Sequence, residues 1–258
     1  MFNRFHFKSL RPFWSLAYIV LPLFSFLLIG ASQDSRSART CTKVHVILEY
    51  RSENFFLDLE SVREMIGAQD LILGSPIQDI QLSQIEETIL ATQYVNKCNA
   101  DFNADGELIV QLWLNNPIAR VMNEKGNSFY VDEKGSMIPV STQFTARTPL
   151  VRGSFIDSIP KAGLVEDSLL QAMVPVLNHL HNDSLWSANT SEVLVHPDGR
   201  WSIITQVGNM RIDMGRISEH QHQFLVLDTF VSQVLNKNGW NRYKRLRFDF
   251  HQQIVAIR

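Results

Sequence analysis

The sequence ADGELIVQLWL, residues 104–114, joins a tight turn to a segment that alternates like a β-strand. Asp-Gly is a common pair in hairpin turns because glycine tolerates a positive φ. The alternation places Leu108, Val110 and Leu112 on one face. Residues 94–102, before the turn, also have the pattern of a strand. We therefore predict an antiparallel hairpin that closes a small module.

The residues before this hairpin predict one more strand and two helices. Residues 43–50 alternate as a strand. Asp58 can cap a helix over residues 59–66, and Ser83 with Glu86 forms a capping box that opens a second helix. The order strand, helix, helix, strand, strand predicts two helices packed on one face of a three-stranded sheet.

This small module, residues 43–115, is predicted to leave an edge of its sheet without a neighbouring strand. Free main-chain groups at an edge can pair with another chain. The edge can equally be blunted by charged side chains or covered by the next module, and the sequence leaves both alternatives open.

Residues 116–258 predict a larger, mostly antiparallel β-domain with helices, so the whole chain has an α+β fold class. The predicted strands before its last helix are residues 118–122, 128–132, 139–151, 191–196, 200–207 and 210–214. A helix is predicted over residues 167–181, where Pro175 should produce a kink. Ser218 and Gln221 form a second capping box that opens a long helix.

The last two predicted strands carry the clearest functional signal. The first, residues 243–250, has one apolar and one mainly charged face. The apolar face has Leu246, Phe248 and Phe250, and the other has Tyr243, Arg245, Arg247 and Asp249. The second strand, within Gln253 to Arg258, is apolar on both faces through Ile254, Val255, Ala256 and Ile257. Its outer edge is either shielded by its own fold or completed by a partner's strand.

An uncharged segment, PFWSLAYIVLPLFSFLLIGA at residues 12–31, follows a basic head at residues 1–11. A helix of about 20 residues rises about 30 Å, which matches the hydrocarbon core of a bilayer. Residues on both sides of the segment are basic, so the positive-inside rule alone does not set its orientation. Because the short head leaves no room for a domain before the span, we predict a single transmembrane helix with a cytoplasmic N-terminus, followed by a linker at residues 32–42. The alternatives are a cleaved signal peptide, a lipoprotein and a buried core helix. Residues 29–31 are only a marginal cleavage site, no cysteine follows the apolar run closely, and a core helix would normally have a polar face.

Charge and cysteine content narrow the function classes. The basic head holds three of the 24 Lys and Arg residues, which leaves 21 against 26 Asp and Glu. This acidic balance argues against a nucleic-acid partner. Cys41 and Cys98 match no metal-binding or redox spacing. A bridge between them is possible in an oxidising compartment.

Two histidine pairs are the only material for an enzyme or a metal site: His179 with His181, and His220 with His222. Both pairs lie in or beside predicted helices, where an offset of two directs the side chains apart. The sequence has no nucleophile elbow, zinc-protease motif or phosphate loop. We expect no catalytic residues, no metal, no cofactor and no small-molecule substrate. An extracytoplasmic hydrolase is the competing hypothesis, which metal titration and hydrolase screening would test.

Several features recur in a fixed order along nearly the whole chain. They are the N-terminal anchor, the small module, and the segments NPIARV at 116–121, SFYVDEKG at 128–135, TARTPL at 145–150, VGN at 207–209 and Tyr243 to Ile257. In this order and spacing the chain resembles the bacterial cell-division family FtsQ, also called DivIB. No single motif is diagnostic.

The resemblance implies a bitopic protein of the bacterial inner membrane at the division septum, with a POTRA domain next to the membrane and a β-domain beyond it in the periplasm. Proteins of this family are not enzymes. They act as scaffolds of the divisome and hold FtsB and FtsL, which regulate septal peptidoglycan synthesis. A POTRA-type polypeptide-handling module of envelope assembly is another candidate, but it predicts several repeats and a barrel.

The resemblance also implies a partner site. In the family, FtsB adds a strand to the last β-strand, and an arginine and an aromatic residue on the preceding strand act as anchors. Arg247 and Phe248 match that pair, and Ile254 to Ile257 match the pairing strand. The chain departs from the pattern at Ile257, near a position where a tryptophan can occur, and has no tail after Arg258. The implied partner-binding residues are Tyr243, Arg247, Phe248, Gln253, Ile254, Val255, Ala256 and Ile257.

Overall fold

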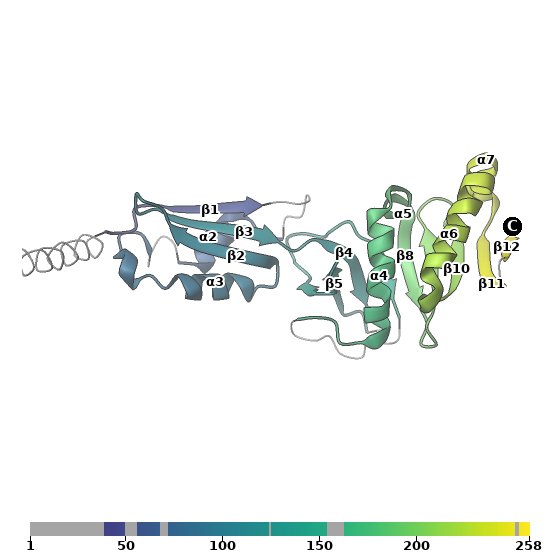
Figure 1. The fold of residues 1–258 in the computed structure, drawn as a ribbon, viewed down its shortest axis with the longest axis horizontal. Helices are drawn as coiled ribbons and strands as arrows, with labels where there is room; N and C mark the ends of the chain where they lie inside the picture. The colour runs from purple at the N-terminus through teal and green to yellow at the C-terminus, as the bar shows by residue number, and fades with distance from the viewer. Residues whose placement is uncertain (1–38, 50–55, 68–71, 124, 154–162, 251–252) are drawn as a thin grey trace, which may run out of the picture.

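A computed structural model shows a small α/β module and a larger β-sheet module arranged end to end (Figure 1). The structure describes residues 39–49, 56–67, 72–123, 125–153, 163–250 and 253–258. The predicted transmembrane segment at residues 12–31 lies outside these residues. Among the helices that the structure describes, none combines the length and the hydropathy of a membrane span.

The small module has the predicted order of elements. These are β1 (Val44–Glu49), α2 (Leu59–Met65), the 3-10 helix η2 (Ile77–Asp79), α3 (Leu82–Leu90), β2 (Val95–Phe102) and β3 (Leu108–Leu114). β3 is central, with β1 parallel on one side and β2 antiparallel on the other. The inward face of β3 packs against Val62 of α2 and Ile89 of α3 in one buried cluster, so both helices cover the same face.

Of the two predicted helix starts in the small module, one is confirmed and the other is wrong. Asp58 caps α2 as predicted, because its carboxylate accepts a 2.7 Å hydrogen bond from the Ser61 amide. The capping box at Ser83 and Glu86 is wrong. α3 starts at Leu82, and Glu86 instead accepts a 2.8 Å bond from the Ala100 amide on β2. A strand amide without a ladder partner gains more from a charged acceptor than a helix end open to water does.

The bond to Ala100 also bears on the two alternatives for the edge of the small sheet. β2 and β1 are its two edge strands. Glu86 places a carboxylate on the outer side of β2, which blunts that edge. In the part of the chain that the structure describes, β1 pairs only with β3.

The large module is a nine-stranded sheet in the order β12-β11-β10-β9-β8-β7-β4-β5-β6. Its strands are β4 (Pro117–Met122), β5 (Ser128–Asp132), β6 (Met137–Pro139), β7 (Leu150–Arg152), β8 (Thr190–Val195), β9 (Arg200–Thr205), β10 (Arg211–Arg216), β11 (Arg245–Phe250) and β12 (Gln253–Ile257). Five neighbouring pairs are antiparallel, and the pairs β4–β7, β7–β8 and β10–β11 are parallel. The sheet is therefore mixed, with an antiparallel majority.

The helices of this module are α4 (Ser168–Asn182), α5 (Ser184–Asn189), the 3-10 helix η3 (Ile217–Glu219), α6 (His220–Phe230), the π-helix η4 (Val231–Leu235), α7 (Asn236–Asn238) and the 3-10 helix η5 (Trp240–Arg242). Asp167 caps α4 through the amides of Leu169 and Leu170. The predicted start of the last long helix is wrong, since α6 is preceded by η3 and lacks a side-chain cap. Gln223, not Gln221, bonds back to the preceding strand, at the Arg216 carbonyl.

The predicted extended segment at residues 139–151 is a strand only at its two ends. β6 ends at Pro139 and β7 begins only at Leu150. In the connection between these strands, the Ala146 amide donates a 3.2 Å hydrogen bond to the side-chain hydroxyl of Tyr130 and not to the main chain of a neighbouring strand. Pro149 has no amide to contribute to a ladder.

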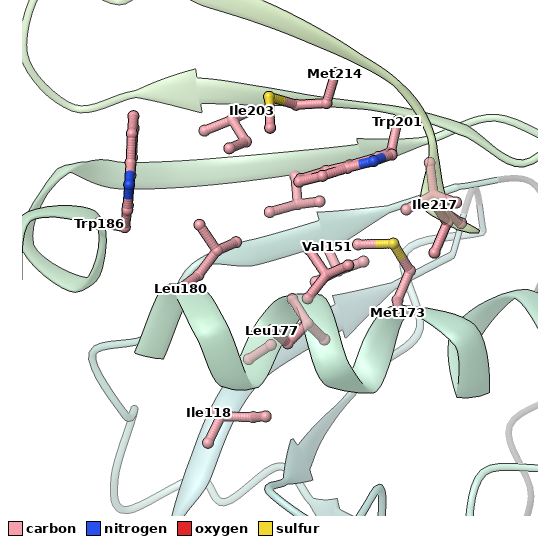
Figure 2. Packing of buried hydrophobic residues seen from close by; sticks show 14 of the residues in the cluster. Ile118, Val151, Met173, Leu177, Leu180, Trp186, Trp201, Ile203, Met214 and Ile217 are labelled. Atoms are coloured by element: carbon pink, nitrogen blue, oxygen red, sulfur yellow. The ribbon is translucent and has the colours of Figure 1, made fainter. Parts of the chain in front are cut away.

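The main core lies between the sheet and the helices on one of its faces. Figure 2 shows Met173, Leu177 and Leu180 of α4 directed toward Trp201 and Ile203 on β9. The other main helix, α6, lies on the same face as α4 and inserts Phe224 into the same cluster (Figure 1). Because both helices cover this face, the charged side chains of the last strands are left on the opposite face.

Candidate partner interface at the C-terminal sheet edge

β12 is the outermost strand of the large sheet, at the end of the molecule far from the small module (Figure 1). It pairs antiparallel with β11, with Arg245 opposite Ile257 and Arg247 opposite Val255. Among the described residues no strand lies on its other side. The strand that the sequence singled out is therefore an edge strand of the described sheet.

The pairing indicates which main-chain groups face that open edge. The Ile257 carbonyl accepts a 2.8 Å bond from the Lys244 amide, so it points toward β11. Main-chain polar groups of successive strand residues point to opposite sides. The amides and carbonyls of Ile254 and Ala256 therefore point outward, where an added strand can bond to them.

Side chains flank this edge on both faces of the sheet. Ile254 and Ala256 are half-buried and pack against the main core. Val255 and Ile257 lie on the opposite face and keep 38% and 42% of their surface exposed. Gln253, at the start of the strand, is exposed. An added strand would therefore cover apolar surface on both faces as well as gaining main-chain bonds.

A charged cluster lies on the outer face beside β12. The parallel register of β10 and β11 sets Arg211 beside Arg245 and Asp213 beside Arg247. Asp213 accepts hydrogen bonds from Arg245 Nε at 2.5 Å, Arg211 Nε at 2.7 Å and Ser202 Oγ at 2.9 Å. Burial acts to raise the pKa of Asp213, but the bonds from Arg245, Arg211 and Ser202 outweigh it and leave the pKa below its usual value. The cluster therefore keeps a fixed carboxylate between two guanidinium groups.

These groups line a hollow of about 450 Å³ on the outer face. Its lining comprises His196, Pro197, Asp198, Arg200, Trp201, Ser202, Arg211, Asp213, Gly215, Arg245 and Arg247. Four arginines thus face two aspartates. Asp198 pairs with Arg200 at 2.7 Å, and Asp213 is shared by two of the others. The excess positive charge suits an acidic group brought in by a partner.

The structure brings together only part of the residue set expected from the sequence. Arg247 lines the hollow, while Phe248 packs against the main core. Tyr243 does not share a face with Arg247, which corrects the sequence interpretation. β11 begins only at Arg245, so its alternation does not extend back to Tyr243. The Tyr243 ring instead meets the Phe230 ring edge-on at 6.1 Å and packs against the core.

Ser202, Arg211 and Asp213 were missed by sequence reasoning. A usable signal was present, because Arg211 and Asp213 alternate with the apolar residues Ile212 and Met214. That alternation places the two charged residues on one face of a strand. The parallel register with β11, which brings them to Arg245, is not visible in the sequence.

The histidine and cysteine candidates lie elsewhere. His179 stacks on Phe224 at 3.9 Å, and His220 Nδ1 lies 2.9 Å from the Ile217 carbonyl. Within the described ranges, no group of three or more His, Cys, Asp or Glu is placed to hold a metal ion. Cys41 and Cys98 are free thiols. Burial, with a smaller contribution from the Glu86 carboxylate, raises the pKa of Cys98 to about 11.

Comparison with known protein families gives two matches. Residues 116–257 match the family described as FtsQ/DivIB, C-terminal related, and this match covers more than half of the chain. The chain belongs to the FtsQ/DivIB-related family. Residues 39–113 match the POTRA-like domain. In this FtsQ/DivIB-related protein the first match contains all nine strands of the large sheet, and the second contains the three-stranded sheet except for Leu114 at the end of β3. A comparison with curated proteins found no match.

Proposed function

We propose that this FtsQ/DivIB-related protein is a non-enzymatic, bitopic scaffold of the bacterial cell-division machinery. It binds FtsB-like and FtsL-like partners, the former by β-strand addition at β12, and couples the divisome to septal peptidoglycan synthesis. The observation that carries the proposal is the open outer edge of β12, with the main-chain groups of Ile254 and Ala256 directed outward. Family membership supports the assignment to cell division.

Strand addition explains how affinity and specificity arise at this site. The main-chain bonds give affinity for any extended segment, and alternate side chains select among segments. A strand beside β12 lies about 10 Å from β11, since neighbouring strands are about 4.8 Å apart. A long acidic side chain next to Val255 can therefore meet the Arg247 guanidinium across β12. Charge-assisted bonds of this kind are among the strongest at protein interfaces.

We place the protein in the bacterial inner membrane at the division septum, with one span at residues 12–31, a cytoplasmic N-terminus and the rest of the chain in the periplasm. The uncharged segment and the basic head support this placement. β12 lies at the end of the described molecule opposite the small module (Figure 1), so the partner site would face away from the membrane.

Co-purification with the FtsB-like partner tests the proposal. The full-length chain should capture the partner, and a chain that ends before Gln253 should lose capture while it still melts cooperatively. The truncation removes β12 and Arg258. β12 holds one edge of the sheet and contributes no fully buried side chain. Retained capture by the cooperatively folded truncated chain would place the site elsewhere.

A further inference from the structure

An aromatic cluster lies where the POTRA-like module meets the large module. Phe56 of the first module is its centre. The Phe56 ring lies 5.5 Å from that of Tyr94 in the same module, 5.4 Å from that of Tyr130 and 5.1 Å from that of Phe144. The last two rings belong to the large module. Phe56 therefore lies between aromatic side chains of both modules.

Burial in this cluster depends on both modules. Phe56 and Tyr130 are each 1% exposed, and Ile138 is fully buried with them. The buried neighbours of Phe56 in the cluster belong to the large module, and Tyr94 of its own module is only partly buried there. Separation of the modules would expose Phe56 to water.

Hydrogen bonds also constrain the geometry of this contact. The Tyr94 hydroxyl donates to the Val140 carbonyl over 3.3 Å and so crosses from one module to the other. The Tyr130 hydroxyl accepts a 3.2 Å hydrogen bond from the Ala146 amide. This bond holds the loop that carries Phe144. Apolar burial alone permits sliding, whereas these bonds select one arrangement.

The covalent connection is fixed as well. Only Asn115 and Asn116 separate β3 from β4. The Asn115 amide donates to the Tyr94 carbonyl at 2.8 Å, and Asn115 Nδ2 donates to the Gln93 carbonyl at 2.8 Å. Gln93 has a positive φ of 63°, which is uncommon for a residue with a side chain. The turn before Tyr94 is thus tied to the first residue of the connection between the modules.

We propose that the cluster around Phe56 locks the two modules into one rigid body. Modules of one chain that share a small polar interface ordinarily move relative to each other. Here a buried aromatic residue, a hydrogen bond between the modules and a two-residue connection oppose that motion. The lock fixes the position and orientation of the β12 edge relative to the N-terminal end of the described chain.

Distance measurements between spin labels test the lock in the full-length chain in detergent. One label replaces Glu87 on α3 and the other replaces Ser187 on α5, with Cys41→Ala and Cys98→Ala as background. The labelled protein with an intact aromatic cluster should give one narrow distance distribution. Phe56→Ala should lose that narrow peak because the modules become free to reorient. Phe102→Ala is the matched control, since Phe102 is partly buried against the core of its own module only.

Phe144→Ala provides a second variant, because Phe144 is only partly buried in the cluster and its removal spares the cores of both modules. It should also broaden the distribution. A broad distribution in the unmodified protein would overturn the proposal, as would a narrow peak that persists when Phe56→Ala and Phe144→Ala are combined. The readout needs no partner, so it is independent of strand capture at β12.

Discussion

Asp213 organises the charged residues beside the C-terminal edge, because it holds Arg211 and Arg245 at the same time. The Asp213 side chain is only 12% exposed, so water could not fully replace either hydrogen bond if it were lost. We expect Asp213→Asn to lower the free energy of unfolding by about 2 kcal/mol, since bonds to a charged group are lost and two guanidinium groups repel each other. Denaturant unfolding measures this change. Asp198→Asn is the control and should change little, because the Asp198–Arg200 pair is exposed. Equal loss in both variants would contradict the role of Asp213.

The lowered pKa of Asp213 also predicts a dependence on pH. A carboxyl group with a folded-state pKa below its unfolded value adds stability that is complete above the unfolded pKa, about 3.9 for Asp. That stability is lost as the pH falls through the folded pKa. The difference in stability between the unmodified protein and Asp213→Asn should therefore be constant near neutral pH and shrink below about pH 4. Denaturant unfolding across this range checks the prediction, and a difference that grows in acid would contradict it.

Arg247, like Arg245, is a residue of the hollow that lies opposite an exposed side chain of β12, in its case Val255. We expect Arg247→Glu to weaken binding of the FtsB-like partner at least about tenfold, because an attractive charge becomes a repulsive one. The melting temperature should change little. Arg216→Glu is a matched reversal on an exposed residue of β10 outside the hollow. Calorimetric titration distinguishes the two variants, and unchanged affinity of Arg247→Glu would remove Arg247 from the interface.

At the scale of the element, the main-chain groups of β12 form two sets. One set faces β11 and holds the strand in the sheet, and the other faces outward, where a partner strand can bind. The groups of Val255 and Ile257 point toward β11, and those of Ala256 point outward. Ala256→Pro therefore removes an outward donor without breaking the ladder to β11, and proline is tolerated on edge strands. We expect this variant to lose partner capture at an unchanged melting temperature.

Val255→Pro is the contrasting variant, because it removes a donor that faces β11. It should detach the strand and lower thermal stability as well as capture. Capture assays combined with thermal melting check both variants. If Ala256→Pro still captures the partner, then the partner does not add a strand at this edge.

The elements also show what a sequence can predict. Strands such as β3 and β9 were found because alternation is a local property, and the cap Asp58 was found because it bonds to an amide only three residues away. The two capping boxes are wrong because hydrogen-bond partners that are distant in sequence can take the place of the helix-end amides. Glu86, for example, accepts a hydrogen bond from the Ala100 amide on β2. The hollow depends on a parallel register between β10 and β11, across more than thirty residues, which no local pattern encodes.

At the scale of the whole molecule, charge is unevenly distributed. The chain has a net charge of −2, yet the hollow beside β12 holds four arginines against two aspartates. An acidic partner would therefore be attracted to this end of the molecule. We expect the association rate with the FtsB-like partner to fall about tenfold between about 50 and about 500 mM salt, while the dissociation rate changes less.

Surface-immobilised full-length protein in detergent allows both rates to be measured across this salt range. Arg247→Glu should flatten the salt dependence of association, because it removes two units of the local positive excess, whereas Arg216→Glu should preserve most of it. The main-chain bonds of an added strand are insensitive to screening, so they should dominate the dissociation rate. An association rate that is independent of salt would mean that the arginines of the hollow do not guide the partner to β12, even if the strand itself is added there.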